Sequence, residues 1–247
     1  MIRALSIAVT LVVAAPADLT WTDIAARLER GAAASDTAVL ASAVADAEKL
    51  ADVSGLDRER ELALLGAAYG AWRLSAIPGV PPVDAQARLK GAEKDLHDLL
   101  KMRPQSGEAY ALLGSVLGQL IRFSGGASKR ELGPLASDAR EQAMRLEPNN
   151  PRVVLQGAMT LYFTPAEYGG GADKAEAGLR QALALFEREP AGRPWPNWGR
   201  FDAHAWLGQV LAARGDKAGA RAEYEQALAV WPGSAWVKHV LMPALAK

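Results

Sequence analysis

The chain has 247 residues, a length that suits one domain or one continuous array of repeats. Half of the residues are hydrophobic and 23% are charged, so the chain can bury a core and lacks the composition of a disordered protein. The 28 basic residues balance 28 acidic ones, which argues against a nucleic-acid partner because neutralising phosphates requires excess positive charge. The absence of cysteine excludes disulfides, zinc–thiolate sites and thiol catalysis.

The first 17 residues have the pattern of a secretory signal peptide. Arg3 precedes an apolar run over residues 4–15, and an Ala-Pro-Ala sequence ends at Ala17. We therefore expect cleavage near Ala17 and a periplasmic or secreted mature protein. The run is shorter than the roughly 20 residues that span a bilayer, and no later segment approaches that length without a charged residue or Pro, so no membrane span is predicted. The alternative is that residues 4–15 form a first buried helix.

Two amphipathic helices are predicted after this segment, within residues 18–57. Residues 20–31 combine Thr and Asp start signals, apolar residues at helical spacing and a closing Gly. Residues 35–55 repeat this arrangement, with Asp36 near the start and Gly55 past the end. No segment alternates with period two over a useful length, so the prediction is an all-α protein.

A helix-pair pattern recurs from residue 58 onward, and its last copy is the clearest. Six residues occupy a frame of about 34 positions that resembles the tetratricopeptide repeat (TPR): Leu207, Gly208, Ala220, Tyr224, Ala227 and Pro232. The family's Trp and Tyr are replaced by His204 and Leu211. The resemblance implies a right-handed TPR-like superhelix, an α-solenoid of antiparallel helix pairs. In such a fold Gly208 would allow two helices to approach closely.

Three earlier copies have longer turns between their helices. Gly66, Gly114 and Gly157 mark the corresponding first helices. Loops are expected at residues 75–82, 125–134 and 164–171, where Gly and Pro accumulate. Residues 58–247 are therefore predicted to form about four helix pairs with inserted inter-helix loops, closed by a capping helix over residues 235–246.

A series of short motifs resembles an uncharacterised group of bacterial secreted or periplasmic TPR proteins. The motifs are Gly133-Pro134, Pro148-Asn-Asn-Pro-Arg152, Thr164-Pro-Ala-Glu-Tyr168-Gly-Gly-Gly-Ala-Asp-Lys-Ala175 and Pro196-Asn-Trp-Gly199. The group has no established biochemical activity. The resemblance therefore implies a fold, an envelope location and the generic role of binding partner proteins or peptides. A more distant likeness is to the periplasmic TPR component of some solute transporters.

Three consecutive glycines, Gly169, Gly170 and Gly171, precede a predicted helix whose first turn contains Lys174. Backbone amides at such a place can bind a phosphate or carboxylate. The alternative is a tight turn in which glycine supplies positive φ. No strand precedes the glycines and the dinucleotide-binding spacing is incomplete, which favours the turn.

Aromatic residues gather in the second half of the chain. Five of the seven Trp residues lie at or after Trp195, and Tyr162 and Tyr168 precede them. Aromatic clusters of this kind can form a recognition surface, in which Trp198 would take part. The alternative is that Trp195 and Trp198 belong to an ordered linker and fill the groove between the third and fourth repeats.

The inner face of the first helices has almost no charge at the positions that usually bind partners. Ala111, Ala205 and Gln209 represent this lining, which excludes a clamp for peptide carboxylates. An apolar peptide, a lipid-like ligand, or a face filled by the inserted loops all agree with it.

No catalytic, metal or cofactor site is predicted. The three His residues are not spaced as metal ligands, and no serine-nucleophile elbow occurs. The sequence therefore predicts a non-catalytic interaction module or scaffold in the bacterial envelope, which binds a protein or peptide partner through its weakly charged concave face. The alternative is a periplasmic small-ligand-binding subunit associated with a transporter.

Overall fold

The computed structural model describes residues 20–190, 192 and 195–246. The predicted signal peptide lies outside the described residues. Ten long helices follow one another in the described part of the chain: α1 Trp21–Ala34, α2 Thr37–Val53, α3 Asp57–Ala76, α4 Pro82–Met102, α5 Gly107–Arg122, α6 Gly126–Leu146, α7 Pro151–Phe163, α8 Ala172–Phe186, α9 Arg200–Ala213 and α10 Lys217–Val230. Short segments are η1 Ala166–Tyr168, η2 Val237–Leu241 and α11 Met242–Ala244.

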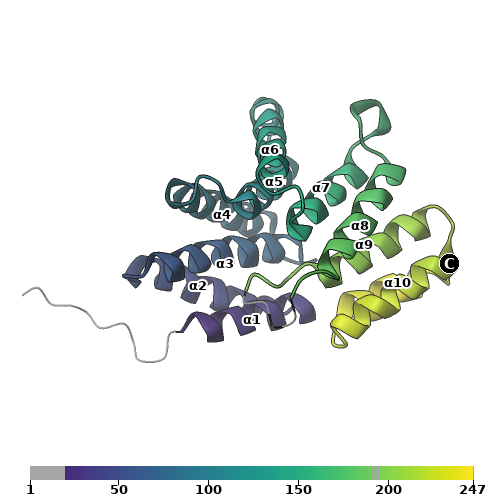
Figure 1. Cartoon of the computed structure of the whole chain (residues 1–247), viewed down its shortest axis with the longest axis horizontal. Helices are drawn as coiled ribbons and strands as arrows, with labels where there is room; N and C mark the ends of the chain where they lie inside the picture. Colours follow the sequence, from purple (N-terminus) through teal and green to yellow (C-terminus); the bar gives the residue numbers. More distant parts are fainter. Residues whose placement is uncertain (1–19, 191, 193–194, 247) are drawn as a thin grey trace, which may run out of the picture.

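Consecutive helices pack as antiparallel pairs, and the pairs stack into an α-solenoid (Figure 1). The odd-numbered helices contact one another in the order α1, α3, α5, α7 and α9, so they form one layer of the stack. Each even-numbered helix packs on the odd-numbered helix before it. None of the described residues forms a strand. The predicted all-α repeat solenoid is confirmed.

The helix ends follow local capping chemistry. Asp36 accepts hydrogen bonds from the amides of Ala38 and Val39 at the start of α2. Helix α1 continues past Gly31 to Ala34 and stops at Ser35, which adopts a left-handed conformation. Gly31 is instead a contact residue, because a Cβ there would lie 2.8 Å from the Leu40 side chain.

Two of the four glycines of the predicted pattern allow close contact within their helix pair. A Cβ on Gly208 would lie 2.3 Å from the ring of Tyr224, so α9 and α10 approach as the TPR pattern implies. A Cβ on Gly114 would lie 2.7 Å from Cγ of Arg140. The arginine thus occupies the place on α6 that an aromatic ring fills on α10.

The other two glycines of the predicted pattern do not have this role. Nothing lies within 4 Å of a Cβ built on Gly157, whereas one built on Gly178 would lie 2.8 Å from Cβ of Ala158. The close contact between α7 and α8 is therefore shifted by one residue from the predicted register. Gly66 of α3 instead faces α1, where a Cβ would lie 2.5 Å from Trp21.

Two of the three predicted loops are present, and one is wrong. The segments 77–81 and 164–171 connect helices as expected, but residues 126–134 belong to α6. This helix continues through Pro134, which normally breaks a helix interior. Ala136, Ala139 and Ala143 are buried against the rest of the molecule. This packing holds the part of α6 after Pro134, whereas residues 126–131 before it are exposed.

The end of the chain differs from the predicted capping helix. Residues 237–241 form a π-helical turn, η2, and the short α11 follows it. Val237, Leu241 and Leu245 are buried and join the main hydrophobic core. The segment therefore covers the last helix pair without forming one regular helix. Among the described residues, no helix is both long and apolar enough to cross a membrane.

Candidate interaction surface

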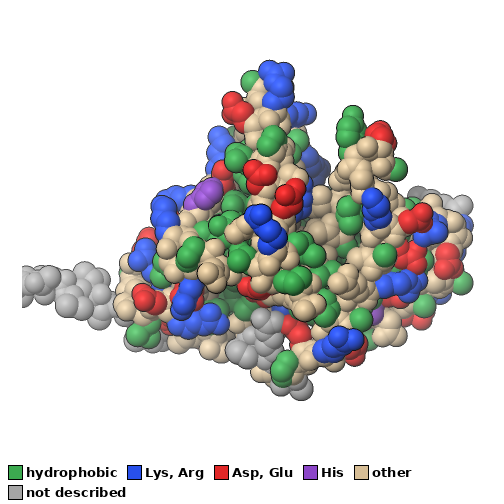
Figure 2. Space-filling view, turned by 45° about the horizontal axis from the view of Figure 1, so that its top comes forward, with side chains coloured by type: hydrophobic (Ala, Val, Ile, Leu, Met, Phe, Trp, Pro, Cys, Tyr) green, Lys and Arg blue, Asp and Glu red, His purple; other side chains and the backbone are tan. Residues whose placement is uncertain are grey.

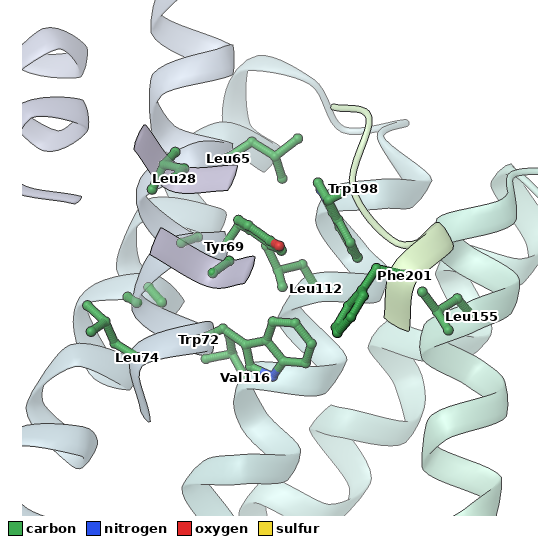
Figure 3. Close-up of a cluster of buried hydrophobic side chains, with 14 of the residues drawn as sticks. Leu28, Leu65, Tyr69, Trp72, Leu74, Leu112, Val116, Leu155, Trp198 and Phe201 are labelled. Atoms are coloured by element: carbon green, nitrogen blue, oxygen red, sulfur yellow. The ribbon is translucent and has the colours of Figure 1, made fainter. Parts of the chain in front are cut away.

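Linker residues 195–199, which precede α9, fill part of the solenoid's interior. Trp198 stacks on Tyr69 of α3 with ring centroids 4.8 Å apart, and Trp195 meets Trp21 of α1 edge-on at 4.8 Å. Figure 3 shows Trp198 and Phe201 directed toward Tyr69 and Trp72. Trp195 and Trp198 are only 6% and 4% exposed. The rings lie in the interior, and the aromatic rings that contact them belong to α1 and α3, whereas the prediction placed them between the third and fourth repeats.

Polar contacts hold this linker in place. Asn197 forms a hydrogen bond with Glu29 of α1. Burial raises the pKa of Glu29, and the hydrogen bond to Asn197 partly offsets this rise. Gly199 has φ of 113°, and a Cβ there would lie 2.7 Å from the Phe186 ring. Only glycine therefore fits both the backbone angle and the space at position 199.

A buried ion pair joins α3 to α9 beside the linker. Arg73 donates to Asp202, whose side chain is only 2% exposed. Burial by itself would lower the pKa of Arg73, but the charge of Asp202, the nearby Tyr69 and the hydrogen bond to Asp202 together raise it. The pair therefore holds α9 against α3, although these helices lie far apart in the sequence.

The Pro-Asn-Asn-Pro-Arg motif supports the turn between α6 and α7. Asn150 caps α7 and donates to Glu108 and Glu147 at 2.9 and 2.6 Å. Arg152 is fully buried and donates two hydrogen bonds to Glu189, at 2.6 and 3.1 Å. Its guanidinium also lies 5.3 Å from the centroid of the Phe186 ring. These contacts give the motif a structural role at the ends of two helix pairs, α5–α6 and α7–α8.

The triple-glycine loop satisfies its own backbone donors. The amides of Gly169, Gly170 and Gly171 donate to the carbonyls of Ala166, Pro165 and Leu161 at 2.9–3.1 Å. Lys174 donates to the carbonyl of Gly169 at 2.8 Å. Gly169 and Gly171 have φ of 86° and 109°. The loop therefore uses its donors and its lysine internally, which leaves no amide of the three free for an anion.

The predicted inner-face residues are mostly inaccessible. Ala111 and Ala205 are 3% and 0% exposed, and Ala111 packs with Ala143 and Val153. Gln209 is half-buried, and its Nε2 has no hydrogen-bond partner among the described residues. The open surface must therefore lie elsewhere.

An aromatic stripe, defined as Tyr162, Phe163, Trp206 and Trp236, crosses α7, α9 and the segment before η2. Trp206 lies 5.9 Å from Tyr162, 5.4 Å from Phe163 and 6.0 Å from Trp236 between ring centroids. Phe163 is 67% exposed, and the other three rings are half-buried.

Tyr168 stands near the tip of the α7–α8 loop and is 78% exposed. Figure 2 shows this loop projecting from the body, separated by a hollow from the projecting end of α5 and α6. The structure thus brings Tyr162 and Tyr168 to one region, next to the loop glycines and Lys174. It places Trp198, Ala111 and Ala205 in the interior.

Sequence reasoning did not include Phe163, Trp206 and Trp236 among the site residues. Trp206 directly follows Ala205, so the inner-face pattern named the buried neighbour of this half-buried ring. Within the described residues, no group of three or more His, Cys, Asp or Glu side chains could hold a metal ion.

Comparison with known proteins supports the fold. No protein family matches the sequence, and no curated protein matches it either. The HusA haemophore from Porphyromonas gingivalis has a similar structure, with a TM-score of 0.66 and 20% identity over 81% of this chain and 96% of that one. The TPR protein TTC0263 from Thermus thermophilus gives a TM-score of 0.60 and 20% identity over 90% and 98%. The chain therefore has a TPR-like fold.

Proposed function

We propose that the protein is a non-catalytic interaction module of the bacterial envelope, which binds an apolar segment of a partner protein at the aromatic stripe and Tyr168. The observation that carries this proposal is the exposure of Phe163 and Tyr168, at 67% and 78%. Aromatic side chains supply much of the binding energy at protein interfaces, while a folded monomer gains little from exposing them. The envelope location rests on the signal-like N-terminal segment.

Internal hydrogen bonds hold the α7–α8 loop that carries Tyr168, and this order favours binding. The amides of Tyr168 and Gly171 donate to backbone carbonyls at 3.0 and 2.9 Å, and the hydroxyl of Thr164 donates to the carbonyl of Thr160 at 2.9 Å. A loop held in this way loses little conformational entropy when a partner docks. Tyr168 makes no hydrogen bond or ring contact with another described residue through its side chain, so the fold gives it no packing role.

In-cell crosslinking of the tagged protein in its own host tests this proposal. The variant Phe163→Ser/Tyr168→Ala should lose a saturable protein partner that the wild type captures. The matched control is Leu56→Ala/Val83→Ser, because these side chains are 69% and 71% exposed on other elements. Circular dichroism should show equal helicity in all three proteins. The proposal would be contradicted if Phe163→Ser/Tyr168→Ala still captured the partner, or if the control variant lost it equally.

A second candidate is the binding of a flat apolar ligand. The stripe holds four rings at centroid separations of 5.2–6.0 Å, and one protein of similar fold is named a haemophore. Haem is therefore a suitable first probe. Native mass spectrometry and quenching of tryptophan fluorescence would detect it, and Trp206→Leu should weaken it. If haem binds and no protein partner is captured, the second candidate replaces the first.

A further inference from the structure

The structure has two grooves of suitable size. The first, of about 570 Å³ at the starts of α3 and α5, is occupied by internal ion pairs, whereas the second contains none among the described residues. This second groove has a volume of about 500 Å³ and lies over α5, between α4 and α6. Its size falls within the usual range for binding pockets, roughly 300–1,000 Å³. It is separate from the aromatic stripe, because the two share no residue.

The floor of the groove is apolar. Leu113 and Leu117 of α5 line it, together with Leu135 and Ala139 of α6 and the ring of Tyr110. Leu135 is 53% exposed, an unusual state for a leucine that faces a concave surface. A partner side chain that covered Leu135 would remove apolar area from water, which stabilises a complex by roughly 25 cal/mol per Å².

The walls of the groove are acidic on both sides. Glu93 stands on α4, and Asp138 and Glu141 stand on α6. The side chains of Glu93 and Asp138 make no ion pair or hydrogen bond with other residues in the described part of the chain. The lining also includes His97 and one cation, Arg145, which donates to Gln142. Carboxylates therefore outnumber fixed cations by three to one in this lining.

We propose that this groove is a second docking site, which binds a helical segment of a partner protein whose leucine-like side chains are flanked by Lys or Arg. Charge complementarity selects this occupant: an apolar ridge fits the leucine floor, and cations on either side meet Glu93 and Asp138. Two helices form the walls, so a third helix can lie along them with its ridge in the groove. The protein would then hold two partners on different faces.

The test uses a fluorescein-labelled helical peptide of about 14 residues, made of leucine on one face and lysine on the other. Fluorescence anisotropy with the full chain should show saturable binding that weakens as salt concentration rises. Asp138→Lys should reduce affinity at least ten-fold, and Leu135→Gln should reduce it several-fold. The matched controls are Glu225→Lys on α10 and Val83→Gln on α4, both exposed sites outside the groove, and each should bind like the wild type.

A second measurement locates the peptide. The chain has no cysteine, so Gln142→Cys provides a single site for an environment-sensitive dye on the groove wall, and Ala229→Cys provides one on α10. The dye at position 142 should respond to the peptide and the dye at 229 should not. Absence of saturable binding, equal loss in Asp138→Lys and Glu225→Lys, or a response at both dyes would overturn the proposal. A wild-type dimer that Asp138→Lys converts to a monomer would instead identify a second copy as the occupant.

Discussion

Arg73 of α3 and Asp202 of α9 form an ion pair across 129 positions of sequence. The side chains are 16% and 2% exposed, and Oδ2 of Asp202 has no hydrogen-bond partner among the described residues. TPR arrays usually depend on contacts between neighbouring repeats. In this chain a direct polar contact also joins distant pairs, beside the linker that fills the inner groove.

Removing one member of this pair should strongly destabilise the protein. Asp202→Ala leaves the buried guanidinium of Arg73 without its carboxylate, which typically costs about 3–5 kcal/mol. Urea unfolding followed by circular dichroism measures the change in the free energy of unfolding. The double variant Arg73→Met/Asp202→Leu should recover part of the loss, because neither remaining side chain is charged.

The surface pair of Arg27 and Asp46 is the control for that prediction. Its nitrogen and oxygen lie 2.7 Å apart, but its side chains are 26% and 32% exposed. Asp46→Asn should therefore cost less than about 1 kcal/mol. Equal losses for Asp202→Ala and Asp46→Asn would show that burial does not strengthen the Arg73–Asp202 contact.

Trp198→Ala should open the inner groove. The substitution removes a ring that stacks on Tyr69 and is 4% exposed, so the free energy of unfolding should fall by about 3–5 kcal/mol. Binding of a hydrophobic dye should increase, and the near-ultraviolet circular dichroism of the aromatic rings should weaken. Trp206→Leu, at a half-buried ring, should cost less. An unchanged near-ultraviolet spectrum in Trp198→Ala would contradict the described packing.

Two glycine substitutions test the shifted register of the third repeat. Gly157 has open space at its Cβ, so Gly157→Ala should stabilise α7 by about 0.5–1 kcal/mol through helix propensity. Gly178→Ala should instead destabilise the protein by about 1–3 kcal/mol, because its Cβ would lie 2.8 Å from Cβ of Ala158. Thermal unfolding of both variants measures the difference. A loss of stability in Gly157→Ala together with a gain in Gly178→Ala would show that Gly157 is the close-contact residue.

The sequence predicted the repeat fold well because small residues and prolines mark helix contacts and helix ends. It predicted single positions less well, since a glycine in a helix looks the same whether it faces the paired helix, as Gly208 does, or open space, as Gly157 does. The Arg73–Asp202 pair was also invisible, because nothing in a local pattern reports a contact between distant helices. For the same reason, the burial of Trp198 could not be separated from exposure before the structure placed Tyr69 against it.

Asp95 of α4 provides a prediction about pH. Its side chain is buried, and this burial, with the nearby charge of Glu48, raises its pKa to about 6, while Lys94 acts in the opposite direction. An unfolded aspartate has a pKa of about 3.9. Between these two values the folded state binds more protons than the unfolded state, so stability should fall as pH rises from about 4 to 6. Above pH 6 the loss should be constant.

Asp95→Asn should therefore be more stable than the wild type at pH 7, by on the order of 1–3 kcal/mol, because it removes a buried charge. The difference should shrink as pH is lowered toward 4 and become constant below about pH 3, where Asp95 is protonated in both states. Asp98→Asn is the matched control on the same helix. Hydrogen bonds from Lys101 and Lys94 lower the pKa of Asp98 to about 2, so this variant should gain no stability at pH 7. Urea unfolding at several pH values measures both variants, and a gain in Asp95→Asn that is independent of pH would contradict the proposed titration.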